Sequence, residues 1–230
     1  TPATWVRIPL GPPLLMPKYK IIDNFLDPDY YQLIVSHFLG DVDTPNVQWN
    51  YERDMSGHQH SNITKYTGKE EPVGISYQGF SHPIWQANHQ YSPYYRVLLP
   101  MIEKIMRLLE NTYCYRIMSF MTLQTGSKRN FSHHIDMPGI KHNTAVFYLN
   151  DSDGDTCLYK EEKPLDSMER VSLDSLTLAE RVQPKANRLL LFQGNQWHSS
   201  ESPVVSPRRV IFNMNFGDTN IVNHDYYDNT

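Results

Sequence analysis

Four short apolar runs in the second half of the chain constrain its fold more than any other feature. They are YRIMSFMTLQ at 115–124, TAVFYL at 144–149, NRLLLFQ at 187–193 and RVIFNMNF at 209–216. Each run is rich in branched or aromatic residues and is bounded by Gly, Asp, Asn or Pro, which is typical of a β-strand. Because no clear helical pattern separates the runs, they favour an antiparallel sandwich or barrel.

Two proline-led patterns predict helices in the first half. Asp27-Pro28 is typical of an N-cap followed by proline at the first helical position, and apolar residues follow on one face as far as Phe38. Ser92-Pro93 gives the same start signal before a broad apolar stripe that reaches Leu109. Pro100 lies inside this stripe, so it either kinks the helix or restarts it. We expect both helices to pack on the sheet.

The segment between the two predicted helices, residues 40–92, is polar, rich in Tyr and His and weakly periodic. Such a segment is typical of irregular structure that covers a site. We therefore expect one domain over residues 1–230. A helical buttress and substrate-covering segment would occupy about 1–112, a β core about 113–218 and a tail 219–230.

Asp153-Gly154, within DSDGD, predicts a β-hairpin turn. The alternating aspartates of this stretch also suggest a calcium-binding loop. Its glycine is misplaced for an EF-hand, however, and no glutamate closes the loop. The hairpin turn is therefore the preferred interpretation.

Composition gives no support to several classes of function. The net charge of −4 gives no electrostatic basis for binding a polyanion, so nucleic acid is not indicated. The chain has only two cysteines, Cys114 and Cys157, which favours a reducing compartment and hence a cytoplasmic location. No stretch approaches the roughly 20 apolar residues of a membrane span. Prolines interrupt the apolar start of the chain, where we expect no signal peptide.

His134 and Asp136 lie two residues apart in the stretch FSHHIDMPG. In a strand this spacing puts both side chains on one face and His133 on the other. A neutral imidazole beside a carboxylate suits a divalent metal such as iron. A hydrogen-bonded surface pair is the alternative, because a His-x-Asp pair often arises by chance.

His198 is the candidate for a third ligand, because it follows a strand-like run and the turn Gly194-Asn195. Its competitor, His224, lies in a polar tail, and His58-Gln59-His60 lies in the irregular segment. Two histidines and one carboxylate on a β scaffold make the facial triad of non-haem Fe(II) oxygenases, which leaves three coordination positions open. A structural zinc site would instead be closed by four protein ligands.

The basic pair Arg208-Arg209 begins the last predicted strand. A planar guanidinium can grip a carboxylate through two hydrogen bonds, but strand alternation lets only one of the pair face inward. If Arg209 faces inward, it is accompanied by Ile211, Asn213 and Asn215. If Arg208 does, the inward set is Val210, Phe212, Met214 and Phe216. Hydrophobicity alone favours Arg208, so alternation leaves both choices open.

Four stretches, taken in order, resemble the Fe(II)/2-oxoglutarate-dependent dioxygenases, and most closely their prolyl 4-hydroxylase-like branch. IIDNFLDPDYYQLI is similar to the opening strand and helix of the family, and HHID to its His-x-Asp strand. NTAVFYLNDSDGDT is similar to its T-x-x-x-Y-L-N-D strand and G-G-E-T-like hairpin, with Asp153-Gly154 in place of Gly-Gly. FQGNQWHSSESPVVSPRRVIFNMNF is similar to its distal histidine, Pro-Val step and basic strand. The stretches span most of residues 20–216, and residues 40–92 have no match.

The resemblance implies a mostly β fold with N-terminal helices and a double-stranded β-helix (jelly-roll) core. It implies that His134, Asp136 and His198 are the iron ligands. It also implies that Arg209 binds the distal carboxylate of 2-oxoglutarate, because Asn213 four residues on fits the same family strand. The basic position comes slightly later after the Pro-Val step than is usual, which keeps Arg208 as an alternative.

Two further residues match the cosubstrate pocket of the family. Tyr148 corresponds to a strand position that lines this pocket, and Thr144 would line it too. The alternative for Tyr148 is an ordinary buried strand tyrosine. Gln124 occupies roughly the position of a pocket aromatic in relatives, so the contacts with the cosubstrate are not all preserved.

The activity implied by the resemblance is hydroxylation of an unactivated C–H bond with release of succinate and CO2. It would use Fe(II), 2-oxoglutarate as cosubstrate, O2 and, as a reductant, ascorbate. The implied partner is a peptide or protein substrate with a prolyl-like target. The alternatives are a hydroxylase of a small molecule or free amino acid, and a non-catalytic metal-binding β-sandwich. Arg209 discriminates between an oxygenase and a non-catalytic module, because a binding module needs no buried basic residue opposite the metal.

Overall fold

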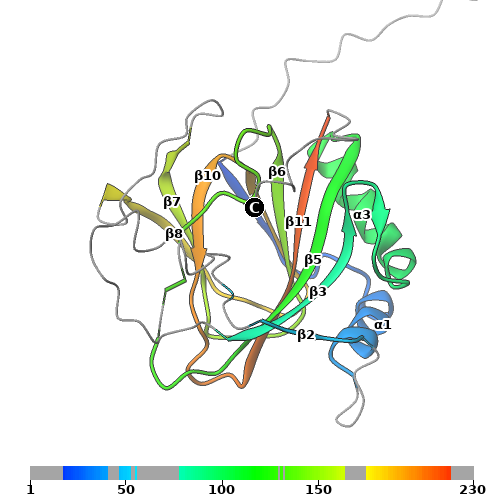
Figure 1. Cartoon of the computed structure of the whole chain (residues 1–230), viewed down its shortest axis with the longest axis horizontal. Helices are drawn as coiled ribbons and strands as arrows, with labels where there is room; N and C mark the ends of the chain where they lie inside the picture. Colours follow the sequence, from blue (N-terminus) through cyan, green and yellow to red (C-terminus); the bar gives the residue numbers. More distant parts are fainter. Residues whose placement is uncertain are drawn as a thin grey trace, which may run out of the picture.

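Two antiparallel sheets form the core of the protein and face each other (Figure 1). The computed structural model describes residues 18–40, 47–52, 55, 78–128, 130–131, 133–163 and 175–218. The large sheet has the order β1-β9-β6-β11-β5-β3-β2, with β4 paired to β3, and the small sheet has the order β10-β7-β8. The strands of the large sheet are β1 (Tyr19–Ile22), β2 (Asn50–Glu52), β3 (Gly79–Gln86), β4 (His89–Gln90), β5 (Tyr113–Leu123), β6 (Asn143–Tyr148), β9 (Arg188–Gln193) and β11 (Arg208–Gly217). Those of the small sheet are β7 (Thr156–Glu162), β8 (Leu178–Val182) and β10 (Gln196–Ser200).

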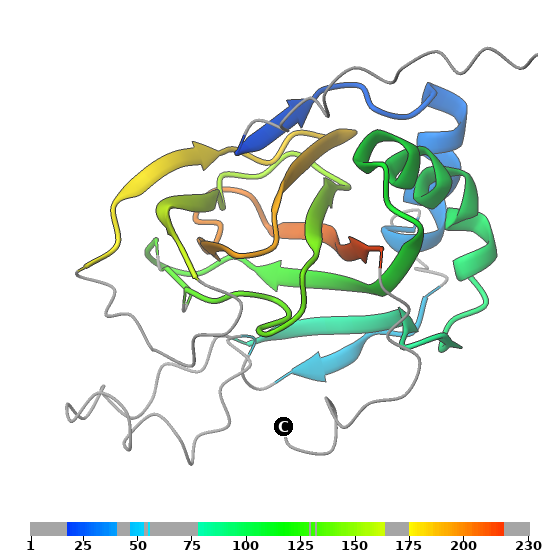
Figure 2. The ribbon, with the colours of Figure 1, turned by 90° about the horizontal axis from the view of Figure 1, so that it is seen from above.

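Two helices, α1 (Pro28–Phe38) and α3 (Tyr95–Leu109), pack on the same side of the large sheet (Figure 2). The prediction of a mostly β fold with N-terminal helices is therefore confirmed. Helix α1 begins as the sequence predicts, because the Asp27 carboxylate accepts a hydrogen bond from the backbone N–H of Asp29 at 3.0 Å.

Pro100 lies inside α3, which runs as one helix on both sides of it. Proline lacks an N–H and disturbs the preceding turn. The hydroxyl of Tyr30, from α1, enters the disturbed stretch: it donates to the carbonyl of Val97 at 2.7 Å and accepts from the N–H of Met101 at 3.3 Å. A side chain of α1 thus satisfies backbone groups next to the proline and ties the two helices together.

The central strands of the large sheet are buried on both faces. Phe212 of β11 meets Phe38 of α1 with ring centroids 4.7 Å apart, and both belong to the apolar cluster beneath the helices. The opposite face turns toward the small sheet, where Tyr148, Phe192 and Ile211 form a second cluster with Leu158 of β7. Polar side chains of β11 also project into the space between the two sheets.

Residues 40–92 contain more regular structure than their sequence predicts. The interpretation of this segment as irregular is wrong for β2, β3 and β4, which extend the edge of the large sheet. Pro83 lies within β3, at a register shift in its pairing with β5. A proline is tolerated at such a bulge because no ladder hydrogen bond is lost there. The predicted tail at 219–230 lies outside the described residues.

Asp153-Gly154 does not form the predicted hairpin turn. The preceding strand, β6, belongs to the large sheet and the following strand, β7, to the small one, so the segment crosses between sheets. The Asp153 carboxylate accepts hydrogen bonds at 2.9–3.0 Å from three successive backbone N–H groups, those of residues 204–206. Gly154 fits closely, because a Cβ at this position would lie 2.6 Å from the carbonyl oxygen of Glu201.

Candidate metal centre

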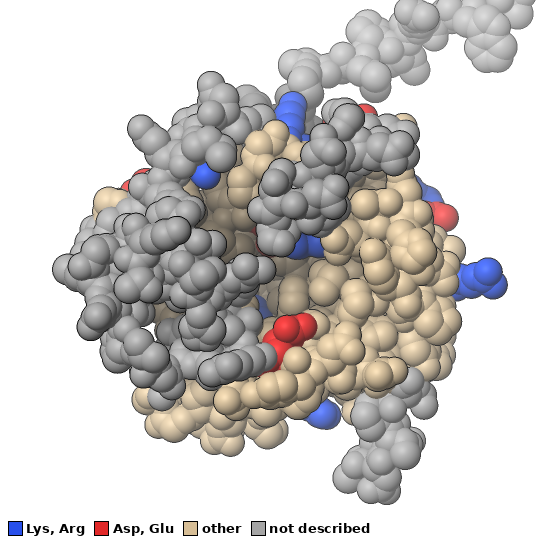
Figure 3. Space-filling model, in the orientation of Figure 1, with Lys and Arg blue, Asp and Glu red and all other residues tan. Residues whose placement is uncertain are grey.

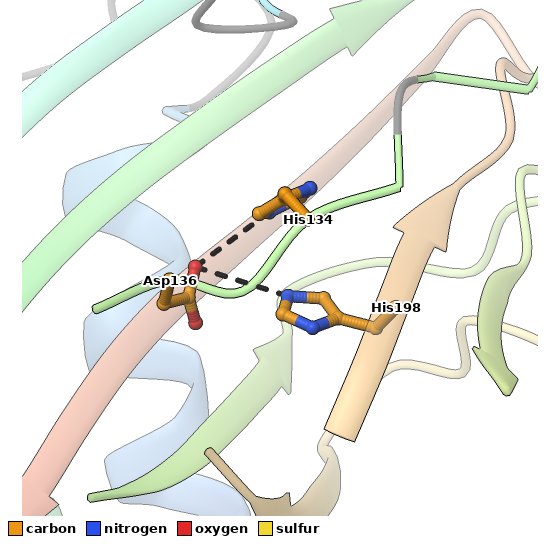
Figure 4. A group of neighbouring side chains, drawn as sticks. All are labelled: His134, Asp136 and His198. Carbon is orange, nitrogen blue, oxygen red and sulfur yellow. Dashed lines mark ion pairs between the residues drawn. The ribbon is translucent and has the colours of Figure 1, made fainter. Parts of the chain in front are cut away.

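Three of the predicted side chains converge between the sheets (Figure 4). Candidate ligand atoms of His134, Asp136 and His198 all lie within 4.8 Å of one another. Oδ1 of Asp136 is 3.7 Å from Nε2 of His134 and 3.8 Å from Nε2 of His198. In Figure 3 the described surface is hollowed near its middle, and Lys or Arg atoms are visible inside the hollow.

The backbone that presents these residues differs from the predicted strand. His134 forms only an isolated antiparallel bridge with His198 of β10, and Asp136 follows in an irregular segment. The bridge consists of two backbone hydrogen bonds, from His134 N–H to the His198 carbonyl at 2.9 Å and the reverse at 3.2 Å. The expectation of a His-x-Asp strand is therefore wrong in detail. The two histidines meet because the bridge sets them opposite each other.

The charge states at this cluster suit a metal cation. Burial alone would raise the pKa of the Asp136 carboxyl, but the neighbouring imidazoles and the Arg116 guanidinium lower it well below its usual range. Burial lowers the pKa of His198, which favours its neutral form. Nδ1 of His198 lies 3.2 Å from the carbonyl oxygen of Gln196 and can donate to it, while its buried Nε2 has no hydrogen-bond partner among the described residues. An unpaired lone pair on Nε2 is what a metal ligand requires.

The Asp136 carboxylate is held by a set of donors. Oδ2 accepts from Thr144 Oγ1 at 3.1 Å and from Asn215 Nδ2 at 2.9 Å. Oδ1 accepts from Arg116 Nη2 at 3.0 Å and from Asn213 Nδ2 at 3.2 Å. Thr144, which was expected to line the cosubstrate pocket, thus contacts a candidate metal ligand. No local sequence signal identifies Arg116 as a site residue; only its pairing with Asn215 across β5 and β11 reveals it.

Arg209 faces inward and is 3% exposed, whereas Arg208 is half-buried at the strand start. Nη2 of Arg209 donates to Thr156 Oγ1 at 2.8 Å, and its guanidinium lies 5.8 Å from the ring centre of Tyr148. The fully buried Tyr148 donates its hydroxyl proton to the same Thr156 oxygen at 2.7 Å. Among the described residues, Nε of Arg209 has no hydrogen-bond partner and no carboxylate pairs with the guanidinium.

The other histidines and cysteines considered in the sequence analysis are not part of this cluster. The ring of His133 packs on Trp197 at 5.4 Å, away from the cluster. His58, His60 and His224 lie outside the described residues. Cys114 and Cys157 are both free thiols. Within the described ranges, neither helix is both long and apolar enough to span a membrane.

Comparison with known proteins agrees with this arrangement. Residues 119–217 match the family model described as the 2OG-Fe(II) oxygenase superfamily, a range that runs from β5 through β11. This range contains the three clustered residues and Arg209, and the match supports the superfamily. Together with the similar folds of solved structures, it supports an Fe(II)/2-oxoglutarate-dependent dioxygenase, a class of enzyme that uses Fe(II), 2-oxoglutarate and O2. No curated protein is similar enough in sequence to match the chain.

Solved structures show the same fold at low sequence identity. A prolyl hydroxylase from Trichoplax adhaerens, in complex with a hypoxia inducible factor oxygen degradation domain peptide fragment, superimposes with a TM-score of 0.57 at 16% identity; 87% of this chain and 84% of that chain are covered. The alpha ketoglutarate dependent epimerase SnoN from nogalamycin biosynthesis gives 0.59 at 12% identity, covering 87% and 78%. A 2OG-Fe(II) oxygenase family oxidoreductase from Burkholderia pseudomallei gives 0.59 at 8% identity, covering 88% of each chain. The predicted double-stranded β-helix core is thereby confirmed.

Proposed function

We propose that this dioxygenase hydroxylates a peptidyl, prolyl-like residue, with His134, Asp136 and His198 as iron ligands and Arg209 as the clamp for 2-oxoglutarate. One observation carries the assignment of the site. The three-residue cluster and a buried arginine that lacks a carboxylate partner among the described residues both lie between the two sheets. Strand β11 links them, because it carries both Arg209 and Asn213, which donates to Asp136.

The residues present fit Fe(II). Two imidazoles and one carboxylate are the ligand set of non-haem iron oxygenases, and this set leaves three positions for cosubstrate and O2. The unpartnered, buried Nε2 of His198 is available for coordination. When bound, iron and 2-oxoglutarate supply the oxidative decarboxylation that yields succinate and CO2 and drives hydroxylation of the substrate.

Arg209 supports the assignment of a dicarboxylate cosubstrate. Burying an ionised guanidinium is unfavourable unless an anion and hydrogen bonds compensate it. Thr156 supplies one hydrogen bond, and the free Nε–H and the remaining Nη protons can grip a carboxylate in a bidentate manner. A non-catalytic β-sandwich has no use for such a group, so Arg209 favours the oxygenase over a binding module.

The surrounding side chains keep His198 and Arg209 ordered and buried. The ring of Phe192 packs edge-on against His198 with centroids 4.8 Å apart. Tyr148 and Thr156 fix the position of the Arg209 guanidinium through their shared hydrogen bonds. A buried, preorganised guanidinium of this kind interacts more strongly with a bound anion than one in water does.

The peptidyl substrate is supported by the likeness of the fold to a prolyl hydroxylase whose structure contains a peptide. A small-molecule substrate is the alternative, because the epimerase SnoN, which belongs to nogalamycin biosynthesis, has a similar fold. We also propose that the helical buttress and the β core form one domain. The apolar cluster shared by α1, α3 and the large sheet supports this arrangement.

The metal site is tested by adding Fe(II) and 2-oxoglutarate to the protein without oxygen. We expect a weak visible charge-transfer band that disappears in His134→Ala and persists in His133→Ala, the matched control from the adjacent position. Absence of the band in the wild-type protein, together with unchanged metal content in His134→Ala, would contradict the proposed site.

The substrate is tested by measuring succinate formation with a panel of proline-containing peptides, free amino acids and small molecules. We expect peptides to stimulate succinate formation and to gain one oxygen atom by mass spectrometry. If only small molecules or free amino acids are hydroxylated, the peptidyl part of the proposal is wrong while the oxygenase part stands.

A further inference from the structure

Arg116 is a charged residue in the site that the ligand and clamp assignments do not use. It lies in the first half of β5, its side chain is 21% exposed, and it forms an ion pair with the deeply buried Asp136 carboxylate. We propose that Arg116 is a positioning residue that, together with Asn215, holds Asp136 so that only one carboxylate oxygen can bind the metal. This inference rests on the iron site proposed above.

Arg116, Asn215 and Asp136 form a closed ring of hydrogen bonds. Arg116 Nη2 donates to Oδ1 of Asp136 at 3.0 Å, and Arg116 Nε donates to Oδ1 of Asn215 at 2.9 Å. Nδ2 of Asn215 closes the ring by donating to Oδ2 of Asp136 at 2.9 Å. Each of the three planar groups contacts the other two, so the ring fixes the plane of the carboxylate.

The ring also fixes which way the Asn215 amide is turned. Its Oδ1 must face the guanidinium, because the guanidinium only donates. Nδ2 therefore faces the carboxylate, and it also donates to Thr144 Oγ1 at 3.2 Å. Thr144 in turn donates to Oδ2 of Asp136 at 3.1 Å. Asn215 and Thr144 are both fully buried, so water does not compete for these bonds.

The two carboxylate oxygens consequently differ. Oδ2 accepts hydrogen bonds from Asn215 and Thr144, and Oδ1 accepts from Arg116 and Asn213. Oδ1, however, also faces Nε2 of both histidines, at 3.7 and 3.8 Å. A carboxylate held in this way binds a metal through Oδ1 alone. Chelation through both oxygens would occupy one more coordination position, and a 2-oxoglutarate chelate plus O2 needs three open positions.

Removal of Arg116 should release the second oxygen. Without the guanidinium, the buried Oδ1 of Asn215 loses its donor, and the amide can turn over. Its oxygen would then face Oδ2 of Asp136 and repel it. Oδ2 becomes free to turn toward the metal. We therefore expect the Arg116→Met variant to change the binding mode of the carboxylate without removing a ligand.

Infrared difference spectra of the full chain, Fe(II)-loaded minus metal-free and recorded without oxygen on protein with 13C-labelled aspartate, test this inference. The wild-type protein should show the wide separation of carboxylate stretches that marks one-oxygen coordination. In Arg116→Met the separation should narrow. The dissociation constant for 2-oxoglutarate should rise, because a carboxylate bound through both oxygens would occupy a coordination position that the cosubstrate needs. Arg107→Met is the matched control, because Arg107 pairs with Glu103 on the exposed surface of α3.

Two further variants separate geometry from charge. Arg116→Lys keeps the charge but lacks the fork that bonds Asn215 and Asp136 together, so it should behave like Arg116→Met. Asn215→Leu breaks the ring from the other side and should narrow the same separation, which keeps the inference testable if Arg116→Met does not fold. Wild-type spectra in Arg116→Met, or full rescue by lysine, would overturn the inference. Failure of the wild-type protein to bind Fe(II) would instead overturn the proposed metal site.

Discussion

Replacement of Arg209 by alanine should weaken 2-oxoglutarate binding while leaving iron binding intact. Arg209 is 3% exposed, and its guanidinium has N–H groups, including Nε–H, that form no hydrogen bond with the described residues. Two charge-assisted hydrogen bonds to a buried carboxylate are each worth about 1.5 kcal/mol, so their loss should cost about 3 kcal/mol. Because each 1.4 kcal/mol corresponds to about a factor of ten, the dissociation constant should rise roughly 150-fold.

The assay is an anaerobic titration of the iron-loaded protein with 2-oxoglutarate, followed by the charge-transfer band. Arg208→Ala is the matched control, because it removes the neighbouring arginine of the same strand, which is half-buried. Its dissociation constant should match that of the wild-type protein. The reasoning is refuted if Arg208→Ala weakens binding in place of Arg209→Ala. It is also refuted if Arg209→Ala binds both iron and 2-oxoglutarate normally.

Three predictions concern the stability of the fold. Phe212→Ala should lower the free energy of unfolding by about 3–5 kcal/mol in urea denaturation, because the fully buried ring fills the contact with Phe38; a loss below about 1 kcal/mol would contradict this packing. The pKa of the Asp153 carboxyl is held below its ordinary value of 3.8, since three backbone N–H donors outweigh the effect of burial. The ionised carboxylate therefore stabilises the fold above pH 3.8, and this stabilisation is lost as the pH falls. Asp153→Ala should lower the free energy of unfolding by about 1 kcal/mol at pH 7 and reduce the loss of stability at acid pH. An acid pH dependence equal to that of the wild-type protein would exclude this role. Gly154→Ala should lower the melting temperature, because its Cβ would lie 2.6 Å from the Glu201 carbonyl oxygen and such overpacking costs about 1–3 kcal/mol. An unchanged melting temperature would contradict this close packing.

The proximity of His134, Asp136 and His198 could be predicted, although the strand expected through His134 and Asp136 does not form. Their order and spacing within the resembling stretches were enough, while the expected strand through His134 and Asp136 is absent. A single backbone bridge to His198 of β10 positions His134, where the sequence predicts a strand. Their roles as iron ligands stay a prediction that the charge-transfer experiment tests.

The choice between Arg208 and Arg209 could not be made from hydrophobicity. That criterion assumes that one face of a strand is buried and the other is solvated. In β11 both faces are buried, one beneath the helices and one between the sheets. The apolar alternation of Val210, Phe212 and Met214 identifies the helix-covered face and not the site. The position of Asn213, which fits the family strand, was the informative signal.

Long-range pairing explains the remaining differences. The local signal of Asp153-Gly154 predicts a turn, but it does not determine whether the next strand joins the same sheet. Residues 40–92 are polar and weakly periodic, so β3 could be recognised only from its pairing with β5, where a register shift accommodates Pro83. Arg116 acquires a role only because β5 pairs with β11 in a register that sets it opposite Asn215. No sequence window contains that information.

Both faces of β11 are buried, so changes in this strand affect the site and the apolar core together. Successive residues alternate between Arg209, Ile211, Asn213 and Asn215 on one side and Val210, Phe212, Met214 and Phe216 on the other. A deletion of one residue in the middle of this strand would exchange the two sets beyond it, sending amides into the apolar cluster and phenyl rings toward the metal ligands. Stability and chemistry would be lost together. Changes in length are therefore expected to be confined to the segments that connect the strands, and variation within β11 to replacement of one side chain at a time.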